Sequence, residues 1–165
     1  MVTELNQTQL ENLAAEVGAR LQKSGQVLVT AESCTGGWVG QCLTAIAGSS
    51  AWYDGGFITY SNTAKMTLLA VPESTLKRHG AVSEATARAM AEGALGRSAA
   101  HWSLAITGIA GPAGGSRKKP VGTVCFAWAQ RDGGCVVETC HFEGDRQNVR
   151  AQAVSHALSG IRDRL

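Results

Sequence analysis

The sequence has few charged residues and no strong excess of either sign. Only 17% of its 165 residues are Asp, Glu, Lys or Arg, and the formal net charge is +2. Proteins that bind nucleic acid usually gather Lys and Arg into a patch, whereas here the only basic run is Arg117-Lys118-Lys119. Such a short run is more typical of a solvated loop. We therefore expect no nucleic-acid partner, although a small anionic ligand would suit the charge.

Long apolar runs, paired cysteines and a signal peptide are also missing. No apolar stretch approaches the roughly 20 residues that a membrane helix needs. Residues 1–16 are polar and acidic, without a basic segment followed by an apolar core. The five cysteines form no CxxC pair, and an odd number of them without a signal peptide is typical of reduced thiols. We expect a soluble, cytoplasmic protein that contacts no membrane.

Nothing in the sequence divides the chain into parts. There is no repeat, no low-complexity tract and no linker. Hydrophobic residues make up 44% of the 165 residues, enough to bury a core without a metal or a disulfide. The prediction is one domain over residues 1–165.

Hydrophobic periodicity predicts helices that alternate with strands. We expect helices over residues 10–25, 35–48, 62–69, 83–94 and 146–164, with a short helical turn from Pro72. We expect strands over residues 26–30, 56–60, 103–107, 121–130 and 135–142, the last two joined by a turn at 131–134. Asn62 and Ser83 are the expected helix caps. This order predicts an α/β/α three-layer domain whose mixed, mostly parallel sheet is closed by a hairpin.

A first glycine-rich segment, TAESCTGG over residues 30–37, follows the first expected strand and begins a helix. Ligands of open α/β sheets bind at the carboxyl ends of strands, and a helix N-terminus offers unpaired N–H groups. Ser33 there could be a nucleophile that faces donors for an oxyanion. The same donors could hold a phosphate, or Ser33 or Thr35 could simply cap the helix. The segment is neither a Walker loop nor a GxSxG elbow.

A nucleophile needs a base, and the segment YSNTAK supplies a candidate. It places Tyr60 at a strand end and Lys65 about one turn into the next helix. A desolvated lysine can act as a general base, although a solvated helix lysine fits the same pattern. Cys34 is a rival nucleophile, because a thiol near a helix start can have a lowered pKa, or it is a small residue packed beneath the turn. The four histidines are scattered and suggest no triad.

A second glycine-rich segment starts at Thr107 and forms a long loop over residues 108–120. Such a loop lets the backbone approach a ligand closely, and its length suggests a mobile cover. Arg146, at the expected start of the last helix, could clamp a phosphate or a carboxylate, or it could be an exposed surface residue. No group of His, Cys, Asp or Glu has metal-ligand spacing, so we expect no metal.

Several motifs, taken in order, resemble the C-terminal domain family of the competence-damage-inducible protein CinA. The motifs are TAESCTGG, the turn Gly48-Ser49-Ser50, GFITYSNTAK, HGAVSE, AITGIAGPAGGS, KPVGTV and FEGDR. They run from about Thr30 to Arg150, nearly the whole chain, and none of the motif positions departs from the family pattern. The chain is similar to the stand-alone bacterial form, since the pyrophosphatase-like domain of full-length CinA is absent.

The resemblance implies a dimeric α/β/α enzyme that hydrolyses nicotinamide mononucleotide to nicotinic acid mononucleotide and ammonia, which returns the nucleotide to NAD synthesis. The family's nucleophile falls on Ser33 and its base on Lys65, with Tyr60 beside it. The expected substrate-binding residues are Cys34, Thr35, Gly36, Gly37, Ser50, Thr107, Gly108 and Arg146. We expect no cofactor. Two other classes remain open: a non-catalytic pyridine-nucleotide-binding module, and a Ser/Lys amidase of another small amide.

Overall fold

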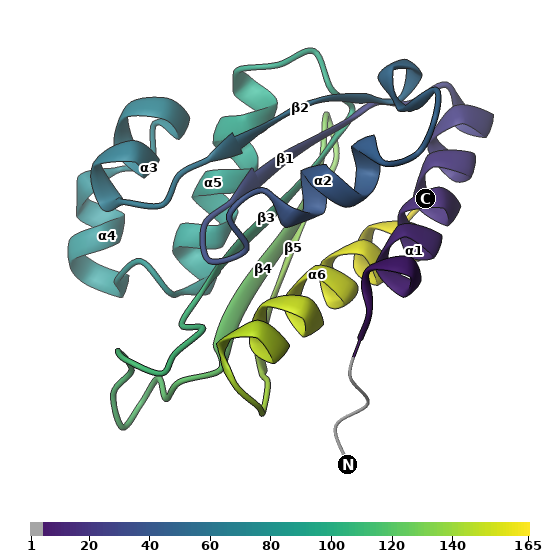
Figure 1. Cartoon of the computed structure of the whole chain (residues 1–165). Helices are drawn as coiled ribbons and strands as arrows, with labels where there is room; N and C mark the ends of the chain where they lie inside the picture. The colour runs from purple at the N-terminus through teal and green to yellow at the C-terminus, as the bar shows by residue number, and fades with distance from the viewer. Residues whose placement is uncertain (1–4) are drawn as a thin grey trace.

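The computed structural model describes residues 5–165, and its centre is a five-stranded sheet (Figure 1). The strands are β1 (Leu28–Glu32), β2 (Tyr53–Ile58), β3 (Trp102–Gly108), β4 (Thr123–Gln130) and β5 (Cys135–His141), in the spatial order β2-β1-β3-β4-β5. β1 pairs in parallel with β2 and β3, while β4 pairs antiparallel with β3 and β5. β4 alone therefore runs against the others, which confirms the predicted mixed sheet with a closing hairpin.

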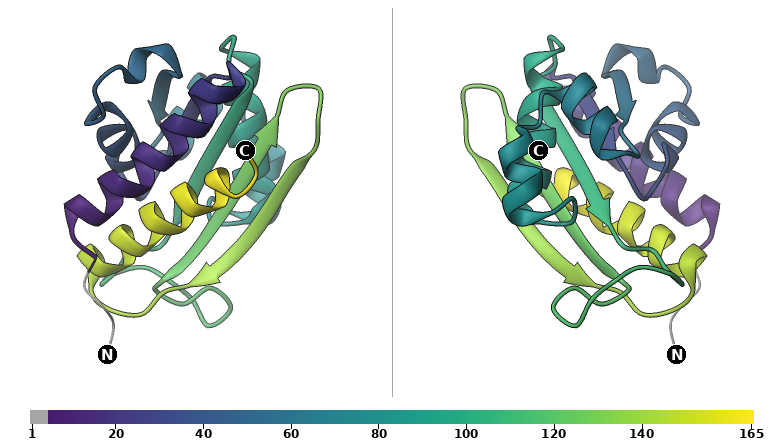
Figure 2. Two further views of the ribbon diagram at one scale, coloured as in Figure 1. Left: turned by 90° about the vertical axis from the view of Figure 1, so that its right-hand side faces the viewer. Right: turned by 90° about the vertical axis from the view of Figure 1, so that its left-hand side faces the viewer.

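Helices cover both faces of this sheet, as the sequence predicts (Figure 2). They are α1 (Gln7–Ser24), α2 (Trp38–Thr44), α3 (Asn62–Leu69), α4 (Glu73–His79), α5 (Glu84–Gly96) and α6 (Arg146–Arg162), with a 3-10 turn η1 (Ser49–Ala51). α1, α2 and α6 share one hydrophobic core with alternate residues of the central strands, among them Leu104 and Ile106. α3, α4 and α5 share the other core with the intervening residues, among them Ala105. The three-layer prediction is confirmed.

Three boundaries near the first glycine-rich segment differ from those expected. β1 ends at Glu32 and not at Thr30, because its parallel partners β2 and β3 continue the pairing to that residue. α2 begins at Trp38, since Gly36 and Gly37 adopt positive φ angles of 61° and 96° and so form a turn outside the helix. β2 begins three residues earlier than expected, as an edge strand beside β1.

The expected cap of α3 is also one residue off. Ser61, not Asn62, has the extended backbone of a cap (φ −92°, ψ 162°), and its hydroxyl accepts a hydrogen bond from the Ala64 N–H at 3.0 Å. Ser83 caps α5 as predicted, and Pro72 precedes α4. Among the helices of residues 5–165, none has the length and apolar character needed to cross a membrane.

Candidate active site

A pocket of about 150 Å³ lies at the carboxyl ends of β1 and β3, the position at which open α/β sheets bind ligands. Five separate segments meet there: the turn after β1, the link into α3 with its first turn, the loop before α5, the end of β3 with the residues that follow it, and the start of α6. Its lining residues are Ser33, Cys34, Tyr60, Lys65, Ala81, Val82, Thr107, Gly108, Ala110 and Arg146. Most residues that the sequence nominated thus meet in one place.

The floor of this pocket holds the predicted pair of Ser33 and Lys65. Ser33 follows directly on β1, and its N–H donates to the carbonyl of Ile106 in β3 at 3.0 Å. Lys65 lies about one turn into α3 and is only 1% exposed. Its Nζ lies 3.0 Å from the Ser33 Oγ. The two side chains come from segments 32 residues apart, so the fold itself builds the pair.

The surroundings of Lys65 favour a neutral amine. Its Nζ also donates to the carbonyls of Thr59 at 2.8 Å and Tyr60 at 3.4 Å. Within residues 5–165, no carboxylate forms an ion pair with it. Burial lowers the pKa of Lys65 below its ordinary value of 10.5. A neutral amine can donate both hydrogens to the two carbonyls and keep its lone pair for the Ser33 hydroxyl, so the arrangement suits proton transfer from Ser33.

Glu32, which the sequence analysis did not nominate, fixes the turn that carries Ser33. The carboxylate is buried and accepts three hydrogen bonds, from the Thr35 hydroxyl at 2.7 Å and from the N–H groups of Val39 at 2.9 Å and Gly40 at 3.0 Å. A carboxylate at a helix N-terminus satisfies unpaired donors and the helix dipole. The sequence analysis offered Ser33 or Thr35 as a cap of this helix. Glu32 supplies the capping hydrogen bonds instead, and neither Ser33 nor Thr35 caps α2.

The same turn also contains backbone N–H groups that no backbone carbonyl of the described residues accepts. Gly36 N–H donates to the Ser33 carbonyl at 3.0 Å, and Ser33 N–H is used by β3. Among residues 5–165, the N–H groups of Cys34 and Thr35 have no backbone acceptor, although the Cys34 N–H interacts with the thiol of its own residue. Free N–H groups beside a nucleophile are the usual components of an oxyanion hole.

Cys34 belongs to the hydrophobic core and is not an activated thiol. It is buried in the core beneath the turn, and a Cβ added at Gly108 would lie 3.1 Å from its Sγ. Burial raises the pKa of the Cys34 thiol to about 12. Of the two readings of this residue, packing beneath the turn is therefore the one that the structure supports.

Tyr60 and Arg146 form the rim of the pocket. The Tyr60 phenol is 65% exposed, and its hydroxyl accepts a hydrogen bond from Arg146 Nη2 at 3.1 Å. Tyr60 lies beside Lys65, as the resemblance implies, and contacts it through the backbone carbonyl, while the phenol bonds with Arg146. Arg146 Nη1 also donates to the Gly111 carbonyl at 2.8 Å, which ties α6 to the long loop.

Thr107 and Gly108 contribute the end of β3 to the pocket. The Thr107 hydroxyl is buried and donates to the Ala81 carbonyl at 2.7 Å, so it anchors the loop that precedes α5. Gly108 packs against Val124 of the neighbouring strand, where an added Cβ would lie 2.8 Å from Val124 Cγ2. Both residues therefore lie where the sequence predicted, with clear packing roles.

A second hollow, of about 360 Å³, is lined by Thr35, Gly36 and Gly37, which do not line the Ser33 pocket. Its other lining residues are Gln7, Trp38, Gln41, Gln147 and Arg150. Arg150 was not predicted, yet its Nε donates to the Cys34 carbonyl at 3.0 Å and its guanidinium lies 5.4 Å from the Trp38 ring centroid. The sequence could have indicated this position, because Arg150 is four residues after Arg146 and residues four apart lie on one helix face.

Ser50 is not brought to the pocket within the chain. It lies in η1, next to Trp52, whose carbonyl accepts from the N–H of Leu28 at the amino end of β1. Ser33 follows the opposite, carboxyl end of the same strand. The resemblance nominated Ser50 as a substrate-binding residue, and within one chain the length of β1 separates it from Ser33.

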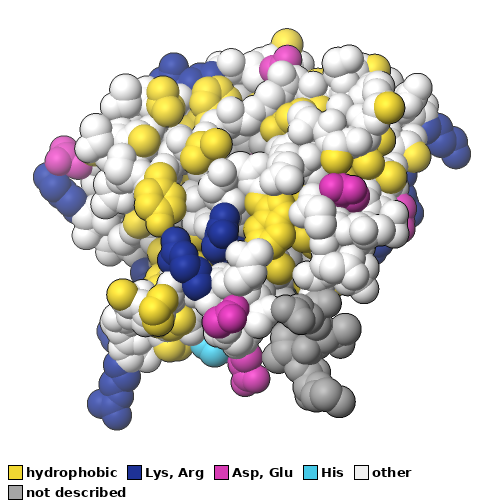
Figure 3. All heavy atoms as spheres, in the orientation of Figure 1, with side chains coloured by type: hydrophobic (Ala, Val, Ile, Leu, Met, Phe, Trp, Pro, Cys, Tyr) yellow, Lys and Arg dark blue, Asp and Glu magenta, His cyan; other side chains and the backbone are white. Residues whose placement is uncertain are grey.

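A larger hollow of about 620 Å³ adjoins the pocket. It is lined by Ala110, Pro112, Val121, Gly144, Asp145, Arg146, Gln147 and Arg150. Ala110 and Arg146 line both spaces, so a ligand can extend from one into the other. On the face shown in Figure 3, basic and hydrophobic side chains lie side by side between α2 and the start of α6. This combination suits an aromatic ligand with an anionic extension.

Known proteins resemble the chain over nearly its whole length. The model of the CinA C-terminal domain matches residues 10–165. The nicotinamide-nucleotide amidohydrolase PncC of Escherichia coli (strain K12) is 50% identical over 157 residues, which cover 95% of each chain. A CinA-like protein of Parasynechococcus marenigrum is 51% identical over 158 residues, 94% of this chain but 37% of that protein. The crystal structure of competence/damage inducible protein CihA from Agrobacterium tumefaciens has a TM-score of 0.91 at 43% identity, covering 98% of this chain and 97% of that one.

Proposed function

The chain belongs to the CinA C-terminal domain family, and from this membership we propose that it hydrolyses the carboxamide of nicotinamide mononucleotide to nicotinic acid mononucleotide and ammonia. One observation carries the proposal. A buried lysine that forms no ion pair with a carboxylate of residues 5–165 lies 3.0 Å from a serine hydroxyl, in a chain 50% identical over 157 residues to a nicotinamide-nucleotide amidohydrolase.

In the first half of the proposed reaction, Lys65 takes the proton of the Ser33 hydroxyl while Ser33 Oγ attacks the carboxamide carbon. The negative charge that develops on the carboxamide oxygen is stabilised by backbone N–H groups of the turn that follows Ser33. The carbon–nitrogen bond then breaks, and Lys65 returns its proton to the leaving nitrogen, which departs as ammonia. The product of this half is an ester between the pyridine carbonyl and Ser33.

In the second half, water resolves this ester. Lys65, neutral again, takes a proton from the water as its oxygen attacks the ester carbonyl. The bond to Ser33 Oγ breaks, and the proton on Lys65 restores the serine hydroxyl. We assign both proton transfers to Lys65 and none to the Tyr60 phenol, because that hydroxyl bonds with Arg146 instead.

The two adjoining spaces suggest how the substrate lies. The pocket of about 150 Å³ is large enough for one substituted aromatic ring and too small for a nucleotide. The hollow of about 620 Å³ beyond Ala110 can take the ribose and phosphate, where Arg146 and Arg150 supply positive charge. The carboxamide would then point inward to Ser33.

The proposal also covers the cellular location and the oligomeric state of the enzyme. All five cysteines are free, as expected in a reducing compartment. We infer a cytoplasmic homodimer whose product returns to NAD synthesis. Light scattering of the purified chain tests the dimer, and cell fractionation tests the location.

The decisive experiment measures ammonia release from nicotinamide mononucleotide by the purified chain, Ser33→Ala and Lys65→Ala. Loss of one oxyanion donor typically costs about 10²–10³ in rate, so loss of the nucleophile should cost more. Lys77→Ala, which alters an exposed lysine on α4, serves as the control and should match the parent. A folded parent protein that releases no ammonia refutes the proposal. Tight nucleotide binding would then indicate a binding module, and activity on simple amides another amidase.

A further inference from the structure

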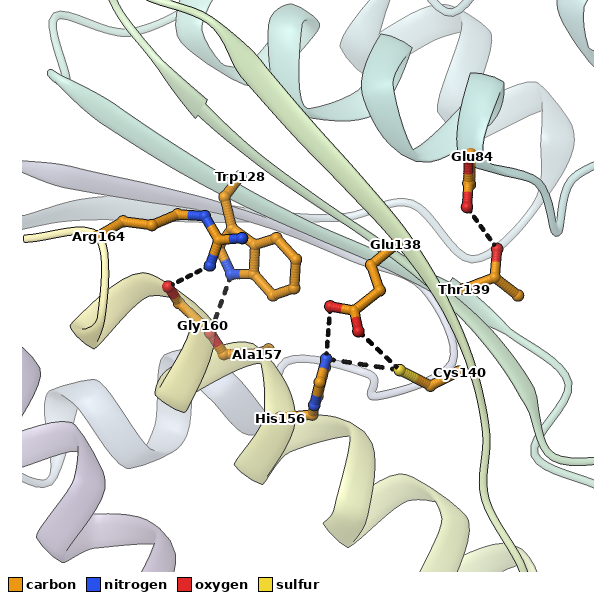
Figure 4. A network of polar contacts seen from close by, with 9 residues as sticks. All are labelled: Glu84, Trp128, Glu138, Thr139, Cys140, His156, Ala157, Gly160 and Arg164. Carbon is orange, nitrogen blue, oxygen red and sulfur yellow. Dashed lines mark hydrogen bonds and ion pairs between the residues drawn. The ribbon is translucent and has the colours of Figure 1, made fainter.

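Three side chains with metal-binding atoms meet between β5 and α6, away from the pocket (Figure 4). Glu138 and Cys140 are two residues apart on β5, so both point to the same side of the strand, toward α6. His156 reaches them from α6. Its Nε2 lies 3.0 Å from Glu138 Oε2 and 3.5 Å from Cys140 Sγ, and Cys140 Sγ lies 3.7 Å from Glu138 Oε1.

These separations match those of three ligands around one tetrahedral zinc ion. With Zn–N and Zn–O bonds of about 2.1 Å and a Zn–S bond of about 2.3 Å, tetrahedral angles place N and O about 3.4 Å apart, and S about 3.6 Å from either. The Nε2–Oε2 distance of 3.0 Å and the Nε2–Sγ distance of 3.5 Å differ from these values by at most about 0.4 Å. The 3.7 Å contact of Sγ is with Oε1, the other oxygen of the same carboxylate, and one ligand atom from each of the three residues lies within 4.8 Å of the other two. An ion could therefore be bound with little movement of the chain.

The imidazole is held in place by its neighbours. The ring centroid of His156 lies 4.7 Å from that of Phe126, 5.8 Å from Trp128 and 6.0 Å from Phe142. The indole of Trp128 is fixed in turn by the guanidinium of Arg164, 4.3 Å above it (Figure 4). A ligand whose orientation is fixed loses little conformational entropy when a metal binds.

The donor set favours a transition metal and leaves room for water. One thiol, one imidazole and one carboxylate suit zinc, whereas magnesium and calcium prefer oxygen donors. The side chains of His156 and Glu138 are 32% and 47% exposed, so solvent can supply a fourth ligand. Without a metal, the Cys140 thiol donates to Glu138, and burial together with that carboxylate raises the pKa of Cys140 to about 11.

We propose that Glu138, Cys140 and His156 bind one zinc ion, with water as the fourth ligand. On binding, the Cys140 thiol gives its proton to solvent and the sulfur coordinates the metal as a thiolate. The ion would join the edge strand β5 to α6, the helix whose first turns carry Arg146 and Arg150. This site is independent of the proposed amidohydrolase reaction, since none of its ligands lines the pocket.

Cobalt titration of the full chain, first freed of metal with a chelator, tests the site. Co²⁺ should produce a thiolate-to-cobalt charge-transfer band and the visible bands of tetrahedral cobalt, saturating at one equivalent and removed by Zn²⁺. Cys140→Ser should abolish the charge-transfer band. His156→Phe, which keeps the aromatic packing, should weaken zinc binding by at least about 100-fold, because loss of even an outer-shell partner costs about 10–100-fold.

Two control variants exclude binding elsewhere. Cys135→Ser removes a thiol of the same strand that packs toward the opposite face, and His79→Asn removes an exposed imidazole. Both should bind cobalt as the parent does. Absence of the charge-transfer band in the parent, or its persistence in folded Cys140→Ser, would overturn the proposal.

Discussion

Replacing Lys65 with methionine should abolish catalysis and also change how stability depends on pH. Burial lowers the pKa of Lys65 in the folded protein, whereas in the unfolded chain it returns to about its ordinary value of 10.5. Between these two pKa values the unfolded chain binds one proton more than the folded protein. The free energy of unfolding of the parent should therefore rise with pH in this window, by up to about 1.4 kcal/mol per pH unit.

The Lys65→Met variant lacks this proton, so its stability should not show that rise. Its own stability should stay close to that of the parent near neutral pH, because two effects oppose each other. Methionine removes the cost of burying an amine, about 1.4 kcal/mol for each unit by which its pKa is lowered. It also leaves the carbonyls of Thr59 and Tyr60 without a donor, at about 1–3 kcal/mol. The variant should therefore fold.

The assay is urea unfolding of both proteins, followed by circular dichroism from about pH 7 to about pH 10. The difference in unfolding free energy, parent minus variant, should increase with pH over this range, which ends below the pKa of Lys65 in the unfolded chain. Ammonia release by the parent should rise about tenfold per pH unit below the folded-state pKa of Lys65 and then level off. Lys77→Met, at an exposed lysine, should follow the parent in both assays.

A stability difference that stays constant over this range would refute the reasoning. Lys65 would then keep its proton in the folded protein and could not accept one from Ser33 near neutral pH. Full activity in Lys65→Met would refute the base assignment directly.

Three further changes test other parts of the site. Glu32→Gln should lower the free energy of unfolding by about 1–3 kcal/mol, because an amide NH₂ would face an N–H donor of α2; urea unfolding measures this. Arg146→Ala should raise the KM for nicotinamide mononucleotide about 10- to 100-fold, the value of a charge-assisted hydrogen bond, with little change for the riboside that lacks the phosphate. Cys34→Ala should lose less than about tenfold in ammonia release, since that thiol is protonated at neutral pH; a loss as large as that of Ser33→Ala would identify it as the nucleophile.

The meeting of Ser33 and Lys65 follows from features that a sequence does carry. Carboxyl ends of neighbouring parallel strands lie at one edge of a sheet, and here Glu32 pairs with Ile58 in register. The residues just after each strand are thereby adjacent, and a helix that starts at Asn62 brings Lys65 back one turn later. Periodicity alone made Lys65 only a candidate base, and the family resemblance supplied its pairing with Ser33; the register of β1 and β2 gives the physical reason for their proximity.

Other features depend on side-chain direction, which periodicity does not determine. Tyr60 follows the last residues of β2, and only the conformation of that link decides that its carbonyl, not its phenol, faces the amine. Glu32 was missed because an end of β1 two residues too early made it a loop residue. Ser50 was nominated by the family resemblance alone, since the order of motifs along a chain gives no information about which end of the sheet each occupies.

The position of Glu32 beside Ser33 explains how the buried Lys65 avoids an ion pair with the nearest carboxylate of the described chain. Successive residues of a strand point to opposite faces. Glu32 continues the face of Leu28, toward α2, where α2 and the Thr35 hydroxyl occupy both carboxylate oxygens. Ser33 points to the other face, toward α3 and Lys65. Had the carboxylate been on that side, it would have paired with the amine and kept it protonated. The alternation of β1 thus separates an acid that holds the turn from an amine that must stay neutral, and any insertion that shifted this register would exchange the two.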